Sequence, residues 1–203
     1  FYLWNKFSGS HRVRFITVPF ESVVGEILSN VHNSHMGVIL KRMMLRAAAQ
    51  IAEEMEVQAL VTGESVAQVS SQTLINLSVI DSVTSTLVLR PLVTFDKNDI
   101  IDIARKIGTE QFAASMPEYC GVISKKPTTR AKEERVVNEE AKFDFSVLDK
   151  AIADRRVQTI DEVMDDESPV AEVAVFAEPP ENTIVLDIRH PDEVDIRPLS
   201  VEG

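Results

Sequence analysis

The alternation of apolar strand segments with amphipathic helical segments is the feature that most restricts the fold of this chain. Residues 14–20, 57–62 and 86–93 are rich in Val, Ile, Leu and Phe, and each predicts a strand. Residues 36–56 carry apolar side chains at three- and four-residue steps, which predicts a helix. Strands and helices that alternate in this way form βαβ units. We therefore expect an α/β fold with a parallel sheet flanked by helices.

The segments after the second and third predicted strands add further helices. A short helix is predicted over residues 74–80, and a longer one runs from a cap at Asp96 to a stop at Gly108. Its inward-facing residues are expected to be Ile100, Ile101, Ile103 and Ala104. Residues 129–158 are charged with a helical pattern and predict a helical C-terminal extension. Its predicted docking contacts are Phe143, Phe145, Val147 and Leu148.

Charge divides the 203-residue chain into an almost neutral body and an acidic stretch. Residues 161–181 hold eight of the acidic residues and no Lys or Arg, so we interpret them as an acidic linker between a domain at 1–160 and a new start at 182–203. The last segment opens with an apolar strand but is too short for its own core. The chain also lacks an initiator Met, and we expect it to be a fragment of a longer protein.

Cysteine usage and hydropathy indicate the compartment. A single cysteine forms no internal disulfide, which is typical of a reducing environment. No apolar run reaches the roughly 18 residues that a membrane span needs, and the N-terminal residues do not resemble a secretory signal. We expect a cytoplasmic protein with no membrane partner.

A polar segment follows the second predicted strand. Residues 63–73 have the sequence GESVAQVSSQT, which begins with Gly63 and supplies uncharged hydroxyl and amide groups up to Gln72 and Thr73. Ligands of parallel sheets bind outside the carboxyl ends of the strands, and such groups suit a planar polar ligand such as a nucleobase or ribose. The alternative is that Gly63 is a turn glycine chosen for positive φ.

Lys41 is a cation on a partly apolar helix face, with Met44, Leu45 and Ala48 three, four and seven residues later. Such a lysine either extends its stem over apolar surface or meets an anion such as a phosphate. The residues by themselves favour the first alternative.

Cys120 lies in a loop-like setting and is followed by the cations Lys125, Lys126, Arg130 and Lys132. A lone cysteine is commonly an inert buried side chain, but nearby cations lower the pKa of a thiol and raise its reactivity. The same cations could contact a phosphate backbone, whereas their mixture with acidic residues favours a solvated helix start. The four histidines form no metal or catalytic pattern.

Three motifs in order, GVILKRMM at 37–44, GESVAQVSSQT at 63–73 and MPEYCGVIS at 116–124, together resemble the bacterial tRNA 4-thiouridine synthetase family. The resemblance covers nearly the whole chain. It implies a PP-loop pyrophosphatase-like ATP domain that adenylates a tRNA uridine and replaces its carbonyl oxygen with persulfide-derived sulfur. The family also provides sulfur for the thiamine thiazole.

By this resemblance, Lys41, Gly63 and Gln72 match positions that bind ATP, which would be accompanied by Mg²⁺. Cys120 matches a cysteine that forms a transient disulfide with a rhodanese cysteine, and residues 187–189 resemble the start of the rhodanese-like domain. The implied partners are tRNA, a cysteine desulfurase as the source of persulfide, the sulfur-carrier protein of thiamine biosynthesis, and a second copy in a homodimer.

Three elements of the family pattern are absent from this sequence: the PP-loop itself, the RNA-binding N-terminal domains and the rhodanese cysteine. We therefore expect the fragment by itself to be inactive. Two alternatives remain: another PP-loop ATPase, such as a different tRNA thiolase or an amide-forming synthetase, and a non-catalytic interaction module that uses its acidic linker.

Overall fold

The computed structural model describes residues 2–8, 13–116 and 126–165 of the chain. The strands are β1 (Arg14–Thr17), β2 (Ala59–Val61), β3 (Leu87–Leu89) and β4 (Arg156–Thr159). The helices are α1 (Tyr2–Phe7), α2 (Glu21–Asn30), α3 (Met36–Glu54), α4 (Leu74–Asp81), α5 (Lys97–Ile107), α6 (Glu110–Ala114), α8 (Glu133–Glu140), α9 (Phe145–Ala153) and α10 (Ile160–Asp165). Two 3₁₀ turns, η1 (Asn33–His35) and η2 (Ser70–Gln72), precede α3 and α4.

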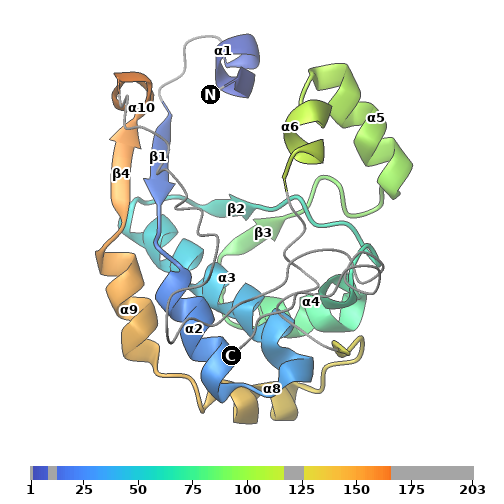
Figure 1. Ribbon diagram of the computed structural model, residues 1–203, viewed down its shortest axis with the longest axis vertical. Coiled ribbons are helices and arrows are strands. Elements are labelled where there is room, and N and C mark those ends of the chain that lie inside the picture. Colours follow the sequence, from blue (N-terminus) through green and yellow to red (C-terminus); the bar gives the residue numbers. More distant parts are fainter. Residues whose placement is uncertain (1, 9–12, 117–125, 166–203) are drawn as a thin grey trace, which may run out of the picture.

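The strands form two separate pairs (Figure 1). Strands β2 and β3 run parallel, with Leu60 opposite Val88, which confirms the predicted βαβ arrangement for this pair. Strand β1 instead pairs with β4 in antiparallel orientation, with Phe15 opposite Gln158. The prediction that residues 129–158 are helical throughout is therefore wrong at its end, because partner β1 imposes extended backbone there.

Helix α3 forms the centre of the core, as its periodicity predicts. Its Ile39 and Met43 side chains are fully buried, and they share one hydrophobic cluster with Val23 and Ile27 of α2. Helices α2, α4, α8 and α9 all contact α3 (Figure 1). Helix α3 therefore presents side chains to most of the described elements, and strand β2 follows it directly.

The C-terminal helices pack against this core mainly through the predicted contacts. Phe143 and Leu148 are buried, and Val147 packs against the same cluster. Phe145 differs, because it is 39% exposed and lies edge-on to the Phe143 ring at 5.5 Å between centroids. Docking through three of the four predicted residues is confirmed, while Phe145 lies at the rim.

A buried ionic cluster joins α3 to α8. The Glu140 carboxylate accepts bonds from Arg42 Nη2 at 2.7 Å and from Arg46 Nη2 at 3.2 Å. The Arg42 and Glu140 side chains are 4% and 7% exposed. Burial favours the neutral form of Glu140, but the arginine hydrogen bonds outweigh it and hold the pKa of Glu140 below 4.5. Arg42 and Arg46 thus hold α8 against α3 through their ion pairs with Glu140.

Helix α5 has the predicted ends, and its predicted face is half-buried. Asp96 and Asp99 form a capping box at its start, and Gly108 ends it with a φ of 85°. Ile100, Ile101, Ile103 and Ala104 are half-buried while the charged residues of α5 are exposed, so the predicted face does point inward, but no residue of the helix is fully buried among the described residues. Helices α5 and α6 contact each other and project away from the helices around α3 (Figure 1).

The predicted domain boundary lies at the end of the described region. Helix α10 covers the start of the acidic stretch, and residues 166–203 lie outside the described residues. The linker and the new start at 182–203 therefore stay predictions. In the described parts of the chain, no helix combines the length and apolar character that a membrane crossing requires.

Candidate functional site

Three of the four predicted site residues lie in the described structure. Lys41 is on α3, Gly63 comes two residues after β2, and Gln72 ends the turn η2. Cys120 lies outside the described residues, so its role stays a prediction. The polar segment that contains Gly63 and Gln72 begins at the carboxyl end of β2, which is where a parallel sheet binds its ligands.

The Lys41 ammonium meets an anion rather than open solvent. Its Nζ lies 2.6 Å from Oε1 of Glu64, the residue after Gly63. The Lys41 side chain is 25% exposed, and the Glu64 side chain is 13% exposed. The interpretation that Lys41 merely extends over apolar surface is therefore incomplete, because its charged end is fixed at the end of β2.

Glu64 is shared between two cations. Arg90, the residue after β3, donates from Nε to Oε2 of Glu64 at 2.8 Å. The other side of the Arg90 guanidinium binds Asp81 through Nη1 at 2.8 Å and Nη2 at 2.6 Å. Burial opposes ionisation of Glu64, but hydrogen bonds from Lys41 and Arg90 together keep its pKa below the usual value. The carboxylate is therefore charged at neutral pH.

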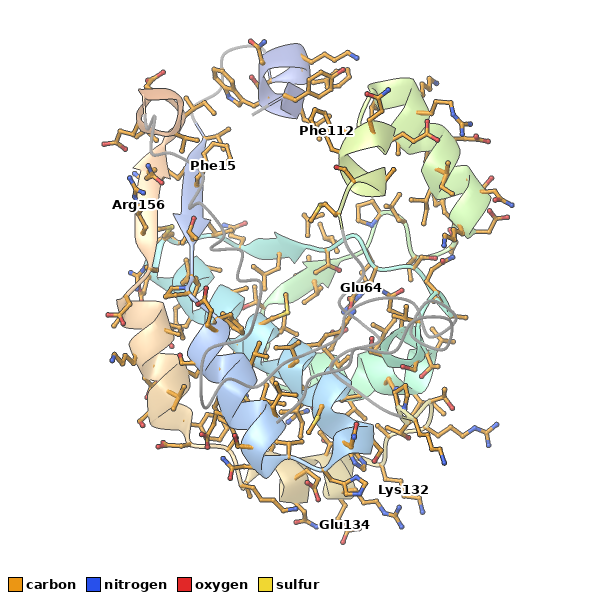
Figure 2. The ribbon with its side chains drawn as sticks, in the orientation of Figure 1. Phe15, Glu64, Phe112, Lys132, Glu134 and Arg156 are labelled. Atoms are coloured by element: carbon orange, nitrogen blue, oxygen red, sulfur yellow. The ribbon has the colours of Figure 1, made fainter. Side chains whose placement is uncertain are left out.

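A cavity of about 280 Å³ opens at this network. Its polar lining consists of Lys41, Thr62, Glu64 and Arg90, and its apolar lining includes Met44 and Leu60. Figure 2 shows Glu64 beyond the ends of β2 and β3, on the side where α4 lies. A cavity with apolar walls and a few charged groups is typical of a small-molecule site.

The segment after β2 is fixed by hydrogen bonds to its neighbours. Ser65 is buried and donates its hydroxyl to the carbonyl of Phe95, and the Val66 N–H donates to the carbonyl of Val93. Ala67 adopts a φ of 64°, a left-handed conformation that is uncommon for a residue with a side chain. Its N–H donates to the Gln72 carbonyl, so the segment closes into a compact loop.

Gly63 is not a turn glycine of the kind first considered. Its φ is not positive, and a Cβ placed on it would meet no atom within 4 Å among the described residues. The backbone here faces open space at the end of β2. A glycine at such a position permits close approach of another group to the backbone, and the nucleotide role of Gly63 stays a prediction.

Gln72 carries an unpaired polar atom. Its Oε1 is buried and accepts no hydrogen bond from the described residues. A buried acceptor without a partner is costly and calls for an explanation such as a ligand. Gln72 does not line the cavity at Lys41, so the unpaired atom does not place a ligand there.

Asn76 is a further residue of this region that sequence reasoning missed. It is fully buried on α4, and its amide donates to the carbonyls of Ser70 and Thr128 at 2.7 and 2.8 Å. Its oxygen accepts from the Ala131 N–H at 2.8 Å. Asn76 thereby holds the Gln72 loop next to residues 128–131, which follow the segment that contains Cys120. No sequence signal marks it beyond a polar residue inside an apolar helix.

The basic cluster that follows Cys120 is solvent-exposed where it is described. Lys126, Arg130 and Lys132 are exposed, and Figure 2 shows Lys132 and the nearby Glu134 pointing outward from the same end of the molecule. This placement agrees with the solvated helix start that the composition favoured, and Lys125 lies outside the described residues.

The charged lining of the cavity holds two cations and one carboxylate, which leaves one net positive charge. Lys41 presents an ammonium with three N–H donors, of which Glu64 accepts one among the described residues. Within residues 2–8, 13–116 and 126–165, no three His, Cys, Asp or Glu side chains lie close enough to hold a metal ion. The assignment of Lys41, Gly63 and Gln72 to a nucleotide site stays a prediction.

The family model described as "Thiamine biosynthesis protein (ThiI)" matches residues 1–145 of the chain. The chain belongs to the ThiI family. This assignment agrees with the resemblance found in the three sequence motifs. The PP-loop ATPases outside ThiI that the sequence left open are accordingly set aside.

Curated relatives of this ThiI chain are named tRNA sulfurtransferase. The protein of Saccharophagus degradans is 61% identical over 203 residues, and that of Tolumonas auensis is 58% identical over 204 residues. Each alignment covers 100% of this chain and 42% of the relative, so the chain spans less than half the length of these proteins.

A solved structure has the same fold. The chain superposes on a 4-thiouridine synthetase crystallised as an RNA complex with bound ATP, with a TM-score of 0.71 and 33% identity. The superposition covers 78% of this chain and 42% of the other. The ThiI fold of the described residues is thus shared with a protein that binds both ATP and RNA.

Proposed function

We propose that this chain is part of an ATP-dependent tRNA sulfurtransferase that converts a tRNA uridine to 4-thiouridine. The observation that supports it most is the Lys41 cavity at the carboxyl ends of β2 and β3, in a ThiI chain 33% identical to a synthetase with bound ATP. Residues 1–160 would be the C-terminal part of the PP-loop adenylation domain. Residues 161–181 would be a linker, and 182–203 the start of a rhodanese-like domain.

The residues at the site fit a nucleotide. ATP would supply the adenylyl group that makes the uracil oxygen a good leaving group. Lys41 would neutralise and orient a phosphate, and the Gly63 backbone would lie against the nucleotide. Gln72 would hydrogen-bond the ribose or base through its side-chain amide. Mg²⁺ would accompany the phosphates.

Cys120 would act after sulfur attack. A persulfide sulfur that attacks the activated uridine expels AMP and stays bound to its carrier cysteine. A second thiol then attacks the sulfur of that cysteine, forms a disulfide with it and releases the thiouridine sulfur. Cys120 is the single thiol of this chain, and we assign it this resolving role. A cysteine desulfurase would provide the persulfide. The same chemistry would serve a sulfur-carrier protein for the thiamine thiazole, and a homodimer is the proposed assembly.

The test is the 4-thiouridine content of tRNA in cells whose only copy of the full-length protein carries Cys120→Ser or Lys41→Ala. We expect a large loss in both strains, with ATP binding retained in Cys120→Ser and weakened in Lys41→Ala. Unchanged 4-thiouridine in Cys120→Ser would contradict the resolving role. Unchanged ATP affinity in Lys41→Ala would contradict the nucleotide site, and would favour an interaction module instead.

A further inference from the structure

Lys41 is one end of a row of four charged side chains from four different parts of the fold. Lys41 lies on α3, Glu64 follows β2, Arg90 follows β3, and Asp81 ends α4. Each neighbouring pair in this row is in direct contact, at 2.6 to 2.8 Å. A single lysine would be enough to attract a phosphate, so the other three charged side chains of the row need a separate explanation.

The two oxygens of the Glu64 carboxylate are divided between its neighbours. Oε1 accepts from Lys41 Nζ, whereas Oε2 accepts from Arg90 Nε at 2.8 Å and from the Thr62 hydroxyl at 3.2 Å. Arg90 keeps its position because both of its Nη atoms bind the carboxylate of Asp81. The planar guanidinium fork suits such contact with two acids, and a lysine at this position could not form it.

The net charge at the cavity depends on the sharing of the Glu64 carboxylate between Lys41 and Arg90. Lys41, Glu64 and Arg90 all line the cavity and sum to one positive charge, while the Asp81 carboxylate lies behind Arg90 and is 38% exposed. If Arg90 were absent, the charges of Glu64 and Lys41 would neutralise each other. A phosphate would then have to displace the Glu64 carboxylate from Lys41, which would be the single cation paired with it in this row.

We propose that Arg90, anchored by Asp81, is a positioning residue that shares the Glu64 carboxylate and so keeps the Lys41 ammonium available to a nucleotide phosphate. The inference rests on the proposed function, in which Lys41 binds ATP. Arg90 acts through Glu64 and Lys41 rather than by direct contact with the phosphate.

The test orders the ATP affinities of four forms of the full-length protein by the charge left at the cavity. This charge is zero in Arg90→Gln, one positive charge in the unaltered protein and in the double variant Glu64→Gln/Arg90→Gln, and two in Glu64→Gln. Equilibrium binding of ATP gives each dissociation constant. We expect each step of charge to change affinity about three- to tenfold, as for charges near a protein surface.

The double variant is decisive. It should bind ATP about as tightly as the unaltered protein, because the competing carboxylate leaves together with Arg90. If Arg90 instead makes a direct contact with phosphate or only stabilises the fold, restoring the charge does not replace it, the double variant binds ATP clearly more weakly than the unaltered protein, and the proposal is overturned. A Glu64→Gln variant that binds ATP more weakly than the unaltered protein also overturns it, and this measurement remains if Arg90→Gln does not fold.

Two controls separate this proposal from the proposed function. Arg105→Gln removes a cation that is 59% exposed on α5, away from the cavity, and should leave ATP affinity unchanged. Lys41→Ala should weaken ATP binding whatever Arg90 does. If Lys41→Ala has no effect, the proposed function fails. If it has the expected effect but the charge order is not found, only the inference about Arg90 fails.

Discussion

The substitution Glu140→Gln tests the buried cluster that joins α8 to α3. In the structure, the Glu140 carboxylate receives two bonds from Arg42 and two from Arg46, and its side chain is only 7% exposed. Glutamine keeps the shape and one acceptor oxygen but loses the charge, and its amide N–H groups would face the arginine donors. The Arg42 guanidinium would then be buried without a counter-ion.

The expected cost follows from that burial. Removing one partner of a buried ion pair destabilises a protein by about 3–5 kcal/mol. Because Arg42 keeps its bonds to the Val79 carbonyl and the Ser82 hydroxyl, we expect a value at the low end, about 3 kcal/mol. The matched control is Asp102→Asn, which removes a carboxylate from an exposed pair with Arg105 and should cost less than about 1 kcal/mol.

Amide hydrogen exchange in the full-length protein measures this cost locally. If α8 exchanges by opening away from α3, a loss of about 3 kcal/mol accelerates its amides roughly 100-fold. The control is measured on α5, where Asp102 lies, and its amides should accelerate by less than about tenfold. Acceleration of α8 in Glu140→Gln by no more than the control would refute the assigned role of the cluster.

The remaining predictions concern two glycines, one amide and one titration. Gly108→Ala should destabilise α5 by about 1 kcal/mol or more, because φ is 85° and the new Cβ would lie 2.3 Å from the Tyr2 hydroxyl. Gly63→Ala should leave thermal stability unchanged, because its new Cβ meets no described atom within 4 Å, and should weaken ATP binding. Asn76→Ala should cost about 2–4 kcal/mol, measured by exchange of the α4 amides, because two carbonyls and one N–H lose their partner. Since the folded-state pKa of Glu140 is lowered, its stabilisation is complete above the unfolded carboxyl value of 4.5 and is lost as pH falls through the folded value, so the gap between the unaltered protein and Glu140→Gln should narrow below pH 4.5. A gap that stays constant to acid pH would contradict the assignment of that pKa.

Elements with strong local signals were predictable from the sequence. Helix α3 follows the three- and four-residue spacing of its apolar side chains, and the ends of α5 follow the Asp96 cap and Gly108. Strand β4 was missed because Arg156 and Gln158 give no apolar run. Its extended form comes from pairing with β1, more than 130 residues earlier in the chain.

Burial was harder to predict than helix formation. The apolar face of α5 has the right spacing, yet no residue of the helix is buried among the described elements. Spacing identifies which residues share a face, but it does not say what covers that face.

The site was predictable where one residue carries the signal, and not where partners meet in space. Lys41 and Gly63 were noticed on the helix face and at the break after the strand, but their assignment to a nucleotide came from the family resemblance and stays a prediction. Glu64, Arg90 and Asp81 became visible only when the fold brought α3, α4 and the ends of two strands together. An arginine at the end of an apolar strand was the one available signal, because a charge there needs a partner.

The most direct measurement is a crystal structure of the full-length protein with a non-hydrolysable ATP analogue. We expect the phosphates at the carboxyl ends of β2 and β3, with one phosphate oxygen about 2.8 Å from Lys41 Nζ and Arg90 still bound to Glu64. The nucleotide should also lie against the Gly63 backbone and hydrogen-bond the side-chain amide of Gln72. A nucleotide bound elsewhere, with Lys41 still paired to Glu64 alone, would contradict the nucleotide site proposed for this chain.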